Sequence, residues 1–348
     1  MVAMSGGVDS SVAAYILKQQ GYECVGATML LHGQTAEGES ADIRDAKAVA
    51  GRLRIEHYVF DLREEFEERV IQPFIDAYVN GRTPNPCVFC NRQMKFRALQ
   101  EKAEELGCDL IATGHYARLE KPADPSEEGA RCVLRKSAIP EKDQSYVLCM
   151  LTQEQLSKSL FPLEGMAKDE VRRIAGEIGL AVADKPDSQD ICFVPDGRYA
   201  EFIEAHERTT FPEGDYCDEE GNIVGRHKGI IRYTIGQRKG LGIALGRPVF
   251  VKTIDPETNR VILSDNDALF TDTLRSGDFN WVSIAPPMKP IHAKARIRYQ
   301  HAEQPAVILP AEDGSVTIRF EQPQRAITPG QTVAVYENDI LLGGGTID

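Results

Sequence analysis

The run Ser-Gly-Gly-Val-Asp-Ser at residues 5–10 constrains the fold of this chain more than any other stretch. A short apolar segment precedes it, and an apolar periodic segment, residues 11–18, follows it before Gly21. This order is typical of a strand, a tight turn and a helix that ends at a glycine. Adjacent glycines let backbone amides approach a phosphate, and the helix N-terminus adds free N–H groups and a positive dipole end. The serines add hydroxyl donors and Asp9 can hold Mg²⁺, so the run predicts a phosphate-binding loop. The alternative is an ordinary glycine turn capped by serines.

The loop differs from the two common nucleotide-binding motifs. It lacks Gly-x-x-x-x-Gly-Lys-Ser/Thr, since no lysine follows the glycines, and it does not match Gly-x-Gly-x-x-Gly. Ser-Gly-Gly-x-Asp-Ser resembles the pyrophosphate-binding loop of N-type ATP pyrophosphatases. That resemblance implies cleavage of ATP between the α- and β-phosphates, with transfer of AMP to a carbonyl-type oxygen.

The first half of the chain alternates between strand-like and helix-like segments. Buried strands are predicted at residues 1–4, 23–31, 57–61 and 110–115, and helices at 11–18, 41–54, 92–106 and 168–179, with another helix around Phe66–Tyr78. Such alternation predicts an α/β fold with a doubly wound parallel sheet. A nucleotide would lie where the second strand ends, at Met29. Two prolines around Asn85 predict a stiff extended loop over residues 81–91, and residues 120–131 and 142–145 read as loops.

The second half has a different texture. After about Pro195, short alternating segments are separated by glycine and proline, which is typical of all-β units. One unit includes residues 215–251. The last, with strands near 293–298, 306–309, 316–320 and 332–336, is predicted to be a small β-barrel. Because 348 residues are too many for one typical core, we expect three domains: 1–195 catalytic, 196–258 central and β-rich, and 259–348 C-terminal.

Charge is distributed unevenly. A formal net charge of −13 argues against bulk affinity for nucleic acid. However, Arg226–Lys252 contains seven Lys or Arg and Lys289–Arg298 contains four, and neither run has an acidic residue. These runs predict a face for a polyanion, with Tyr233 and Tyr299 available to stack on bases, although each run alone fits an ordinary solvated surface.

Eight cysteines are scattered through a chain that has no apolar run long enough to span a membrane and in which we expect no signal peptide, because its first residues read as a core strand. This usage predicts a reducing cytoplasm and catalytic or metal-binding thiols. Cys87 and Cys90 form a Cys-x-x-Cys motif, but the sequence has neither the second cysteine pair of a zinc site nor the context of a thioredoxin motif. An alternative is that the two cysteines lie in the core by chance and have no chemical role. Cys192 lies near the end of the α/β portion. Two separate cysteines suit a thiol relay, in which one thiolate attacks and a second resolves the intermediate.

Eight motifs in order make the chain similar to the tRNA-specific 2-thiouridylase family, which makes 2-thiouridine at wobble uridine 34. They span nearly the whole chain: Ser5–Ser10, Gly81–Pro86, Cys90–Asn91, Lys95–Phe96, Gly114–Arg118, Lys142–Tyr146, Ile191–Phe193 and Ile235–Gly242.

The resemblance implies a role for each matching position. It implies ATP binding by Ala3, Met4, Ser5, Gly6, Gly7, Val8, Asp9, Ser10, Met29 and Gly114. It implies a nucleophile at Cys90 and a persulfide carrier at Cys192. It implies contact with the target base by Asn85, Pro86 and Cys87. It implies contact with tRNA by His115, Lys142, Asp143, Gln144, Arg298, Tyr299 and Gln331. Cys87 stands where relatives often carry aspartate, so we do not expect its thiol to be essential.

The implied reaction begins with adenylylation of uracil O2 and release of pyrophosphate, whose charge Mg²⁺ and the loop amides stabilise. Sulfur then reaches C2 from a Cys192 persulfide, which a cysteine desulfurase or a sulfur-relay protein loads. AMP leaves, and a Cys90–Cys192 disulfide awaits a reductant. The base must leave its stack to react.

Two alternatives remain from the residues alone. Another ATP pyrophosphatase could act on a small molecule, but it would need neither paired cysteines nor basic β-domains. An RNA-binding protein or thiolase could instead hold an iron–sulfur cluster on Cys87, Cys90 and Cys192, which is not favoured.

Overall fold

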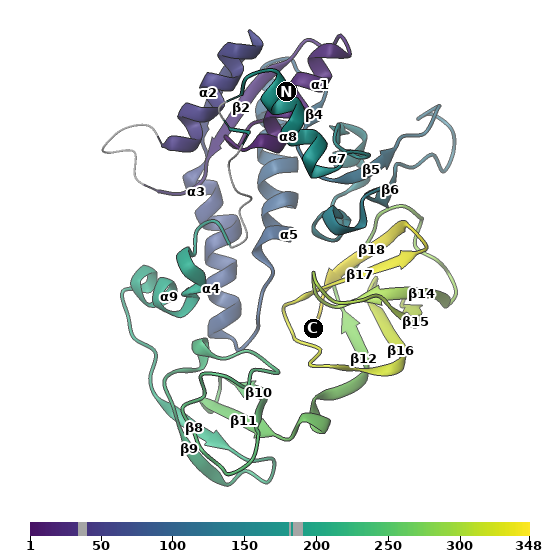
Figure 1. Cartoon of the computed structure of the whole chain (residues 1–348). Coiled ribbons are helices and arrows are strands. Elements are labelled where there is room, and N and C mark those ends of the chain that lie inside the picture. The colour runs from purple at the N-terminus through teal and green to yellow at the C-terminus, as the bar shows by residue number, and fades with distance from the viewer. Residues whose placement is uncertain (34–39, 181, 184–190) are drawn as a thin grey trace.

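The computed structural model describes residues 1–33, 40–180, 182–183 and 191–348, and the chain forms three β-sheets (Figure 1). The first sheet is parallel throughout, in the order β3-β2-β1-β4-β7. Its strands are β1 (Val2–Ala3), β2 (Val25–Leu30), β3 (Glu56–Asp61), β4 (Ile111–Ala112) and β7 (Ser159–Leu160). The predicted α/β fold with a parallel, doubly wound sheet is confirmed.

The strand order reverses at β1, which lies between β2 and β4. In a sheet of this type, ligands bind outside the carboxyl ends of the strands at such a reversal. Residues 5–10 follow β1 directly and Gly114 follows β4, so the fold brings two distant glycine turns to this point.

Helices α1 (Val8–Gln19), α2 (Ala41–Leu53) and α8 (Lys168–Glu177) share one hydrophobic core with β1. Their apolar residues recur at helical spacing, and Val12, Val49 and Val171 are buried in that core. The α1 helix is therefore fixed by burial of its inner face, and its N-terminus stays at the edge of the sheet.

Two long helices are interrupted by π-helical segments. One contains α3 (Arg63–Phe66), a π segment (Glu67–Ile71) and α4 (Gln72–Val79). The other contains α5 (Pro86–Cys90), a π segment (Asn91–Ala98) and α6 (Leu99–Glu105). The predicted extended loop over residues 81–91 is therefore wrong beyond Asn85. Pro86 occupies the first helical position, where its fixed φ and missing N–H carry no penalty.

The middle of the chain forms a small mixed sheet in the order β10-β11-β8-β9. Its strands are β8 (Gly214–Cys217), β9 (Ile223–His227), β10 (Phe250–Asp255) and β11 (Arg260–Ser264). The all-β prediction after Pro195 is wrong for α9 (Tyr199–Glu207). That helix forms because Ala200 and Ile203 bury one face against the α3–α4 helix.

The third sheet is antiparallel and contains the C-terminal strands in the order β12-β16-β15-β14-β17-β18. Their bounds are β12 (Phe270–Ser276), β14 (Ile291–Arg296), β15 (Gln304–Pro310), β16 (Val316–Arg325), β17 (Thr332–Glu337) and β18 (Ile340–Thr346), and β13 (Asn280–Trp281) pairs with β18. The four strands predicted here are all present.

This third sheet continues into the first part of the chain. Strand β18 pairs with β6 (Val133–Lys136), which pairs with β5 (Ala117–Glu120). Arg135 also forms an ion pair with Asp339 at 3.0 Å. The hairpin ties the C-terminal unit to the first unit of the chain, and residues 121–130 form its mostly exposed loop.

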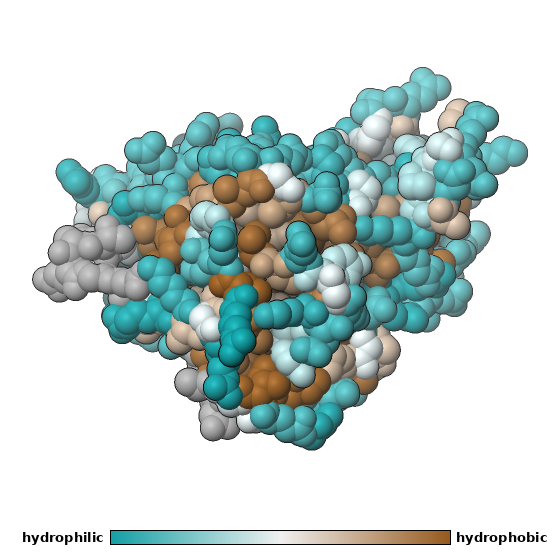
Figure 2. All heavy atoms as spheres, turned by 90° about the horizontal axis from the view of Figure 1, so that it is seen from above, coloured by the Kyte–Doolittle hydropathy of each residue, from teal (hydrophilic) through white to brown (hydrophobic). Residues whose placement is uncertain are grey.

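Seen from above, the molecule shows apolar side chains in a central area surrounded by hydrophilic ones (Figure 2). Scattered exposed apolar residues, such as Tyr22, Val59 and Leu106, are ordinary for a folded protein. Within the part of the chain that the structure describes, no helix is both long and apolar enough to cross a membrane.

Candidate active site

The two glycine turns pack directly on each other. Gly6 has φ +70°, and a Cβ added there would lie 2.4 Å from the carbonyl oxygen of Asp42. A Cβ on Gly114 would lie 2.9 Å from the backbone nitrogen of Ser10. Only glycine fits either position without a shift of backbone, so the loop is held in one shape between its neighbours.

The loop leaves the start of α1 open for a ligand. Gly7 occupies the N-cap without a side-chain hydrogen bond, and the first N–H groups of a helix have no intrahelical acceptor. The serine hydroxyls turn inward instead: Ser10 Oγ accepts from Ser5 N at 3.2 Å, and Ser11 Oγ donates to the Gly7 carbonyl at 2.8 Å. The structure therefore offers backbone amides and a helix dipole to an anion.

The other predicted ATP residues lie on adjoining strands. Ala3 in β1 is paired with Ala27 in β2, and Met4 N donates to the Ala27 carbonyl at 2.7 Å. The Met4 carbonyl accepts from Thr28 Oγ1 at 2.7 Å, and Met29 follows on the same strand, half-buried. All ten positions thus lie at or beside the ends of β1, β2 and β4.

Asp9 has two partners that sequence reasoning missed. Lys168 Nζ lies 2.8 Å from both Asp9 carboxylate oxygens, and the Tyr116 hydroxyl donates to Asp9 Oδ1 at 2.6 Å. Tyr116 belongs to a recognised motif, but Lys168 was noticed only as the start of a helix. One feature of the sequence could have pointed to Lys168. No lysine follows the glycines of the loop, so a cation that binds phosphate there would have to come from another segment.

The donor set around the loop suits Mg²⁺ because it consists of carboxylate and hydroxyl oxygens. Among the described residues, no group of three or more His, Cys, Asp or Glu is placed to hold a metal ion.

Cys87, Cys90 and Cys192 are neighbours in the structure. Cys87 and Cys90 lie on α5, and the Ile191–Phe193 motif that contains Cys192 begins directly after residues 184–190, which lie outside the described residues. Neighbouring protein atoms shield all three thiols from part of the solvent, although Cys87 and Cys192 are exposed as residues, and this desolvation raises the pKa of each thiol, to about 12 for Cys90. The charges of Cys192 and Cys87 also raise the pKa of Cys90. Cys192 is exposed at the surface, whereas Cys90 is half-buried. The geometry fits a pair with one accessible and one sheltered thiol, but these three cysteines do not form a metal-ligand set.

Lys95 is a cation within electrostatic reach of all three thiols. Its charge lowers the pKa of Cys87, Cys90 and Cys192, opposing the effect of burial. It follows Cys90 by five residues within the π segment, where i→i+5 hydrogen bonds bring residues five apart to one side of the helix. Lys95 was part of a recognised motif without an assigned role.

The segment predicted to meet the target base is fixed from the C-terminal unit. Gln331 Nε2 donates to the carbonyls of Thr83 at 2.9 Å and Pro84 at 3.3 Å, and Thr83 N donates to the Pro329 carbonyl at 2.9 Å. Asn85 is half-buried, Pro86 is buried, and Cys87 is exposed at the start of α5. The predicted tRNA residue Gln331 thus already binds protein.

The predicted tRNA residues of the first unit are mostly engaged in the fold. His115 is 8% exposed, and burial, with the charge of Lys95, holds its pKa well below the usual range. Asp143 is buried and accepts hydrogen bonds from Ser137 N and Ser145 N, each at 3.1 Å. Gln144 Oε1 accepts from Tyr116 N at 3.0 Å, and Lys142 is half-buried. Direct contact of His115 with tRNA would need its side chain to move.

Tyr299 and its neighbours form a surface between units. Tyr299 is 44% exposed, its hydroxyl donates to the Asp143 carbonyl at 3.2 Å, and its ring centroid lies 5.8 Å from that of Tyr146. The guanidinium of Arg296 lies over both rings, at 4.8 Å from Tyr146 and 5.7 Å from Tyr299. Arg298 donates to the Arg325 carbonyl at 3.1 Å. Tyr146 is fully buried beneath Tyr299, so Tyr299 is the ring of this pair that is exposed enough to stack on a single-stranded base.

Several cations of the basic run Arg226–Lys252 are already paired with acidic side chains of the protein, which the sequence of the run did not indicate. Four of the run's seven cations form ion pairs with acids from other segments: Arg226 with Asp215, Arg232 with Glu201 and Glu204, Arg247 with Asp265, and Lys252 with Glu219. Tyr233, predicted to stack on bases, is buried at 4% exposure, so that prediction is wrong for this structure.

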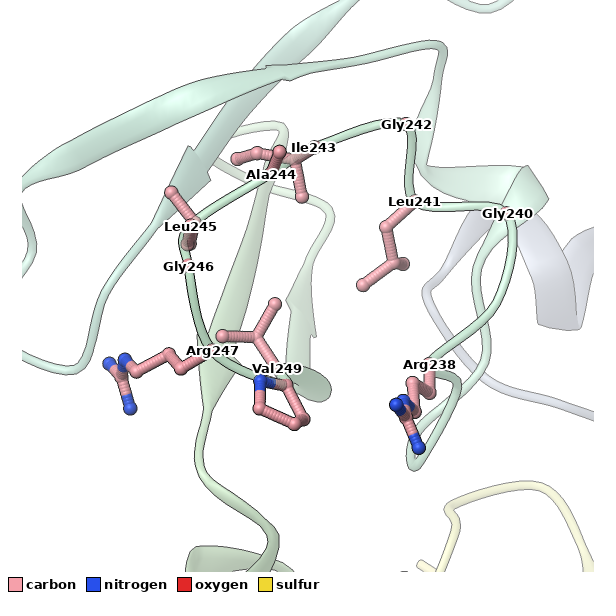
Figure 3. Close-up of a pocket in the computed structure, with 11 residues that line it drawn as sticks. Arg238, Gly240, Leu241, Gly242, Ile243, Ala244, Leu245, Gly246, Arg247 and Val249 are labelled. Atoms are coloured by element: carbon pink, nitrogen blue, oxygen red, sulfur yellow. The ribbon is translucent and has the colours of Figure 1, made fainter.

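Arg238 and residues 240–249 of the central unit surround an open hollow of about 630 Å³ (Figure 3). Figure 3 shows the side chain of Leu241 pointing into the space that the loop encloses, with Arg238 and Arg247 near the two ends of the loop, on opposite sides of that space. Arg238 and Lys239 are exposed. Lys228, outside this loop, is an exposed cation of the same run.

Family models match consecutive parts of the chain. The model described as "tRNA methyl transferase HUP domain" matches residues 1–196, "tRNA methyl transferase PRC-barrel domain" matches 200–265, and "Aminomethyltransferase beta-barrel domain" matches 271–347.

Full-length relatives are similar over the whole chain. The tRNA-specific 2-thiouridylase MnmA of Clostridioides difficile is 48% identical over 355 residues, covering 100% of this chain and 97% of the relative. That of Acetivibrio thermocellus is 48% identical over 356 residues, covering 100% and 98%. Among solved structures, an NMN synthetase from Francisella tularensis is 17% identical over 53% of this chain and 64% of that chain, with a TM-score of 0.33. A likeness that slight supports no argument about this chain.

Proposed function

This chain belongs to the tRNA-specific 2-thiouridylase family, and from that premise we propose that it is a tRNA-uridine 2-sulfurtransferase. It would use ATP to activate O2 of uridine 34 and then replace that oxygen with sulfur. The observation that carries the proposal is the joint presence of two features in one unit. An open helix N-terminus lies at the reversal of the sheet, and Cys192 lies close enough to Cys90 for its charge to raise the Cys90 pKa.

The two features are connected through the Gly114 turn. Gly114 packs on Asp9 and Ser10, while the next residue, His115, lies within electrostatic reach of Lys95. The charge of Lys95 in turn lowers the pKa of all three thiols. The packing at Gly114 and the electrostatic influence of Lys95 support a single site in which the activated base meets the sulfur carrier.

The first step we propose is AMP transfer. Uracil O2 attacks the α-phosphorus of ATP, the bond between the α-phosphorus and the bridging oxygen breaks, and pyrophosphate leaves. The open amides at the start of α1 stabilise the departing charge. Mg²⁺, when bound, would further shield the phosphates, with Asp9 as its protein ligand. Ala3–Ser10, Met29 and Gly114 are the residues we assign to ATP.

The second step is sulfur transfer. The terminal sulfur of a Cys192 persulfide attacks C2, and AMP departs with the former O2. Cys90 thiolate then attacks Cys192 Sγ, which breaks the S–S bond, forms the Cys90–Cys192 disulfide and leaves a thiocarbonyl at C2. Alternatively, Cys90 attacks first and releases hydrosulfide, which attacks C2. Either order consumes one dithiol reductant per turnover.

The remaining assignments complete the proposal. Asn85, Pro86 and Cys87 would contact the target base. The tRNA contacts would be His115, Lys142, Asp143, Gln144, Arg298, Tyr299 and Gln331. A cysteine desulfurase or sulfur-relay protein in the cytoplasm would load exposed Cys192. The catalytic, central and C-terminal domains would cover 1–195, 196–258 and 259–348.

The test is direct. Purified protein is incubated with uridine-34 tRNA, MgATP, a persulfide donor and a dithiol, and digested nucleosides are analysed by mass spectrometry. We expect 2-thiouridine together with AMP and pyrophosphate. AMP release without tRNA thiolation would favour a small-molecule ATP pyrophosphatase. Activity that tracks bound iron in anaerobic protein would favour an iron–sulfur enzyme.

A further inference from the structure

Lys168 is held at the mouth of the loop by an ion pair that leaves Asp9 partly open. Its Nζ lies 2.8 Å from both carboxylate oxygens of Asp9, and its side chain is 10% exposed. The Asp9 side chain is 31% exposed and keeps a second partner, the Tyr116 hydroxyl at 2.6 Å. The ammonium group is therefore sheltered, whereas the carboxylate that it contacts faces solvent on one side.

The loop itself supplies no cation. Residues 1–17 contain no Lys or Arg, and the first basic residue, Lys18, donates to the Leu53 carbonyl at the far end of α1. In the common phosphate loop, a lysine that follows the glycines contacts the β- and γ-phosphates. Here the fold brings a lysine from 159 positions away to the first turn of α1.

We infer that Lys168 binds the β- and γ-phosphates of ATP, exchanging the Asp9 carboxylate for phosphate oxygens when the nucleotide enters. The inference rests on the proposed function, which places ATP at this loop. The triphosphate carries more negative charge than one carboxylate, so the electrostatic attraction on the Lys168 ammonium is stronger after the exchange. Asp9 keeps the Tyr116 hydroxyl and stays available to the Mg²⁺ that accompanies ATP. Without nucleotide, the ion pair keeps Lys168 directed at the loop.

The test compares ATP with AMP, which lacks the two outer phosphates. Lys168→Met keeps the aliphatic stem and removes the charge. By calorimetry with Mg²⁺, we expect its Kd for ATP to rise roughly 10- to 100-fold, the range for one charge-assisted hydrogen bond, while its Kd for AMP stays within about twofold. Lys168→Arg should recover part of the ATP affinity. Arg173→Ala is the matched control, because it removes an exposed cation from the same helix, where Arg173 pairs with Glu177.

A second variant tests the exchange without altering Lys168. In EDTA, Asp9→Asn should bind ATP more tightly than the parent protein, because Lys168 no longer has to leave a carboxylate. A lysine that only supports the fold predicts no gain.

Three results would overturn the inference: unchanged ATP affinity in Lys168→Met, parallel loss of ATP and AMP affinity, or no gain in Asp9→Asn. These binding results are independent of catalysis. If the parent protein shows the predicted pattern but makes no 2-thiouridine, the proposed function fails and the role of Lys168 stands.

Discussion

The side-chain amide of Gln331 donates to the carbonyl oxygen of Thr83 at 2.9 Å, across 248 positions of sequence. The neighbouring Gly330 packs so closely on this segment that a Cβ there would lie 3.0 Å from the same carbonyl. Thr83 lies three residues before α5, which carries Cys87 and Cys90. The C-terminal unit therefore holds the segment that presents the cysteines.

Gln331→Ala should lower the thiolation rate by about tenfold, because two carbonyls lose a donor worth roughly 1–3 kcal/mol. ATP binding should not change, since the loop at residues 5–10 is supported elsewhere. Both are measured on one preparation, by nucleoside mass spectrometry and calorimetry. Gln322→Ala, an exposed glutamine of the same unit, is the control. Equal loss in both variants would show that Gln331 has no special link to the loop.

Asp9→Ala should abolish adenylylation in MgATP while tRNA affinity stays within about twofold. The carboxylate contacts Lys168 and Tyr116 and is directed at the phosphate site, so tRNA surfaces are unaffected. AMP release and filter binding measure the two properties. A matching fall in tRNA affinity would mean that the loop has been assigned to the wrong ligand.

Single substitutions of the three cysteines should have different effects on thiolation. Cys90→Ser and Cys192→Ser should each stop thiolation but keep adenylylation, because AMP transfer needs no thiol and a serine hydroxyl is too weakly acidic to carry sulfur at neutral pH. Cys87→Ser should keep substantial activity. An iron–sulfur centre predicts a different pattern, with all three variants inactive and bound iron lost in parallel.

The pH dependence of Cys90 reactivity should reflect its raised pKa, which the charge of Lys95 partly lowers. Burial raises the pKa of Cys90 from its ordinary value of 9.0 to about 12, so its thiolate forms only as pH rises toward that value. Its alkylation by iodoacetamide should therefore keep accelerating above pH 9, where an ordinary cysteine levels off. Lys95→Met removes the charge that opposes burial and should slow the reaction further at every pH.

Peptide-resolved mass spectrometry measures Cys90 separately from Cys87 and Cys192. Lys95→Arg should preserve the profile, and Arg97→Ala, which removes an exposed cation paired with Glu101, is the control. An unchanged profile in Lys95→Met would place the controlling charge elsewhere.

Arg298→Ala should weaken tRNA binding and reduce the slope of log K against log salt by about 0.7–0.9, the contribution of one phosphate contact. Titrations at several salt concentrations measure the slope. Arg319→Ala, on an exposed position of β16, should leave it unchanged. A constant slope in Arg298→Ala would assign phosphate binding to other cations of the two basic runs, whose exposed members include Lys228, Arg238, Lys239, Lys289 and Lys294.

Sequence reasoning succeeded where a property depends on a few adjacent residues. The glycine run predicted a loop that only glycine can form, as the 2.4 Å approach of Asp42 to Gly6 shows. Periodicity predicted α1, α2 and α8, because burial of one helix face repeats every three to four residues. It failed at Pro86, where proline starts a helix instead of continuing an extended loop, and at α9, whose pattern was too short to stand out.

By itself, then, the sequence determined the alternation of elements, the anion-binding turn and the presence of paired thiols. Only the tertiary structure decided which charges meet. It placed Lys168 on Asp9, buried Tyr233, and paired four cations of an acid-free run with acids from other segments. The physical reason is that backbone conformation and amphipathic burial follow local spacing, whereas electrostatic interaction and solvent exposure depend on distance through space. Distances between remote segments are fixed only when the sheets and helices pack.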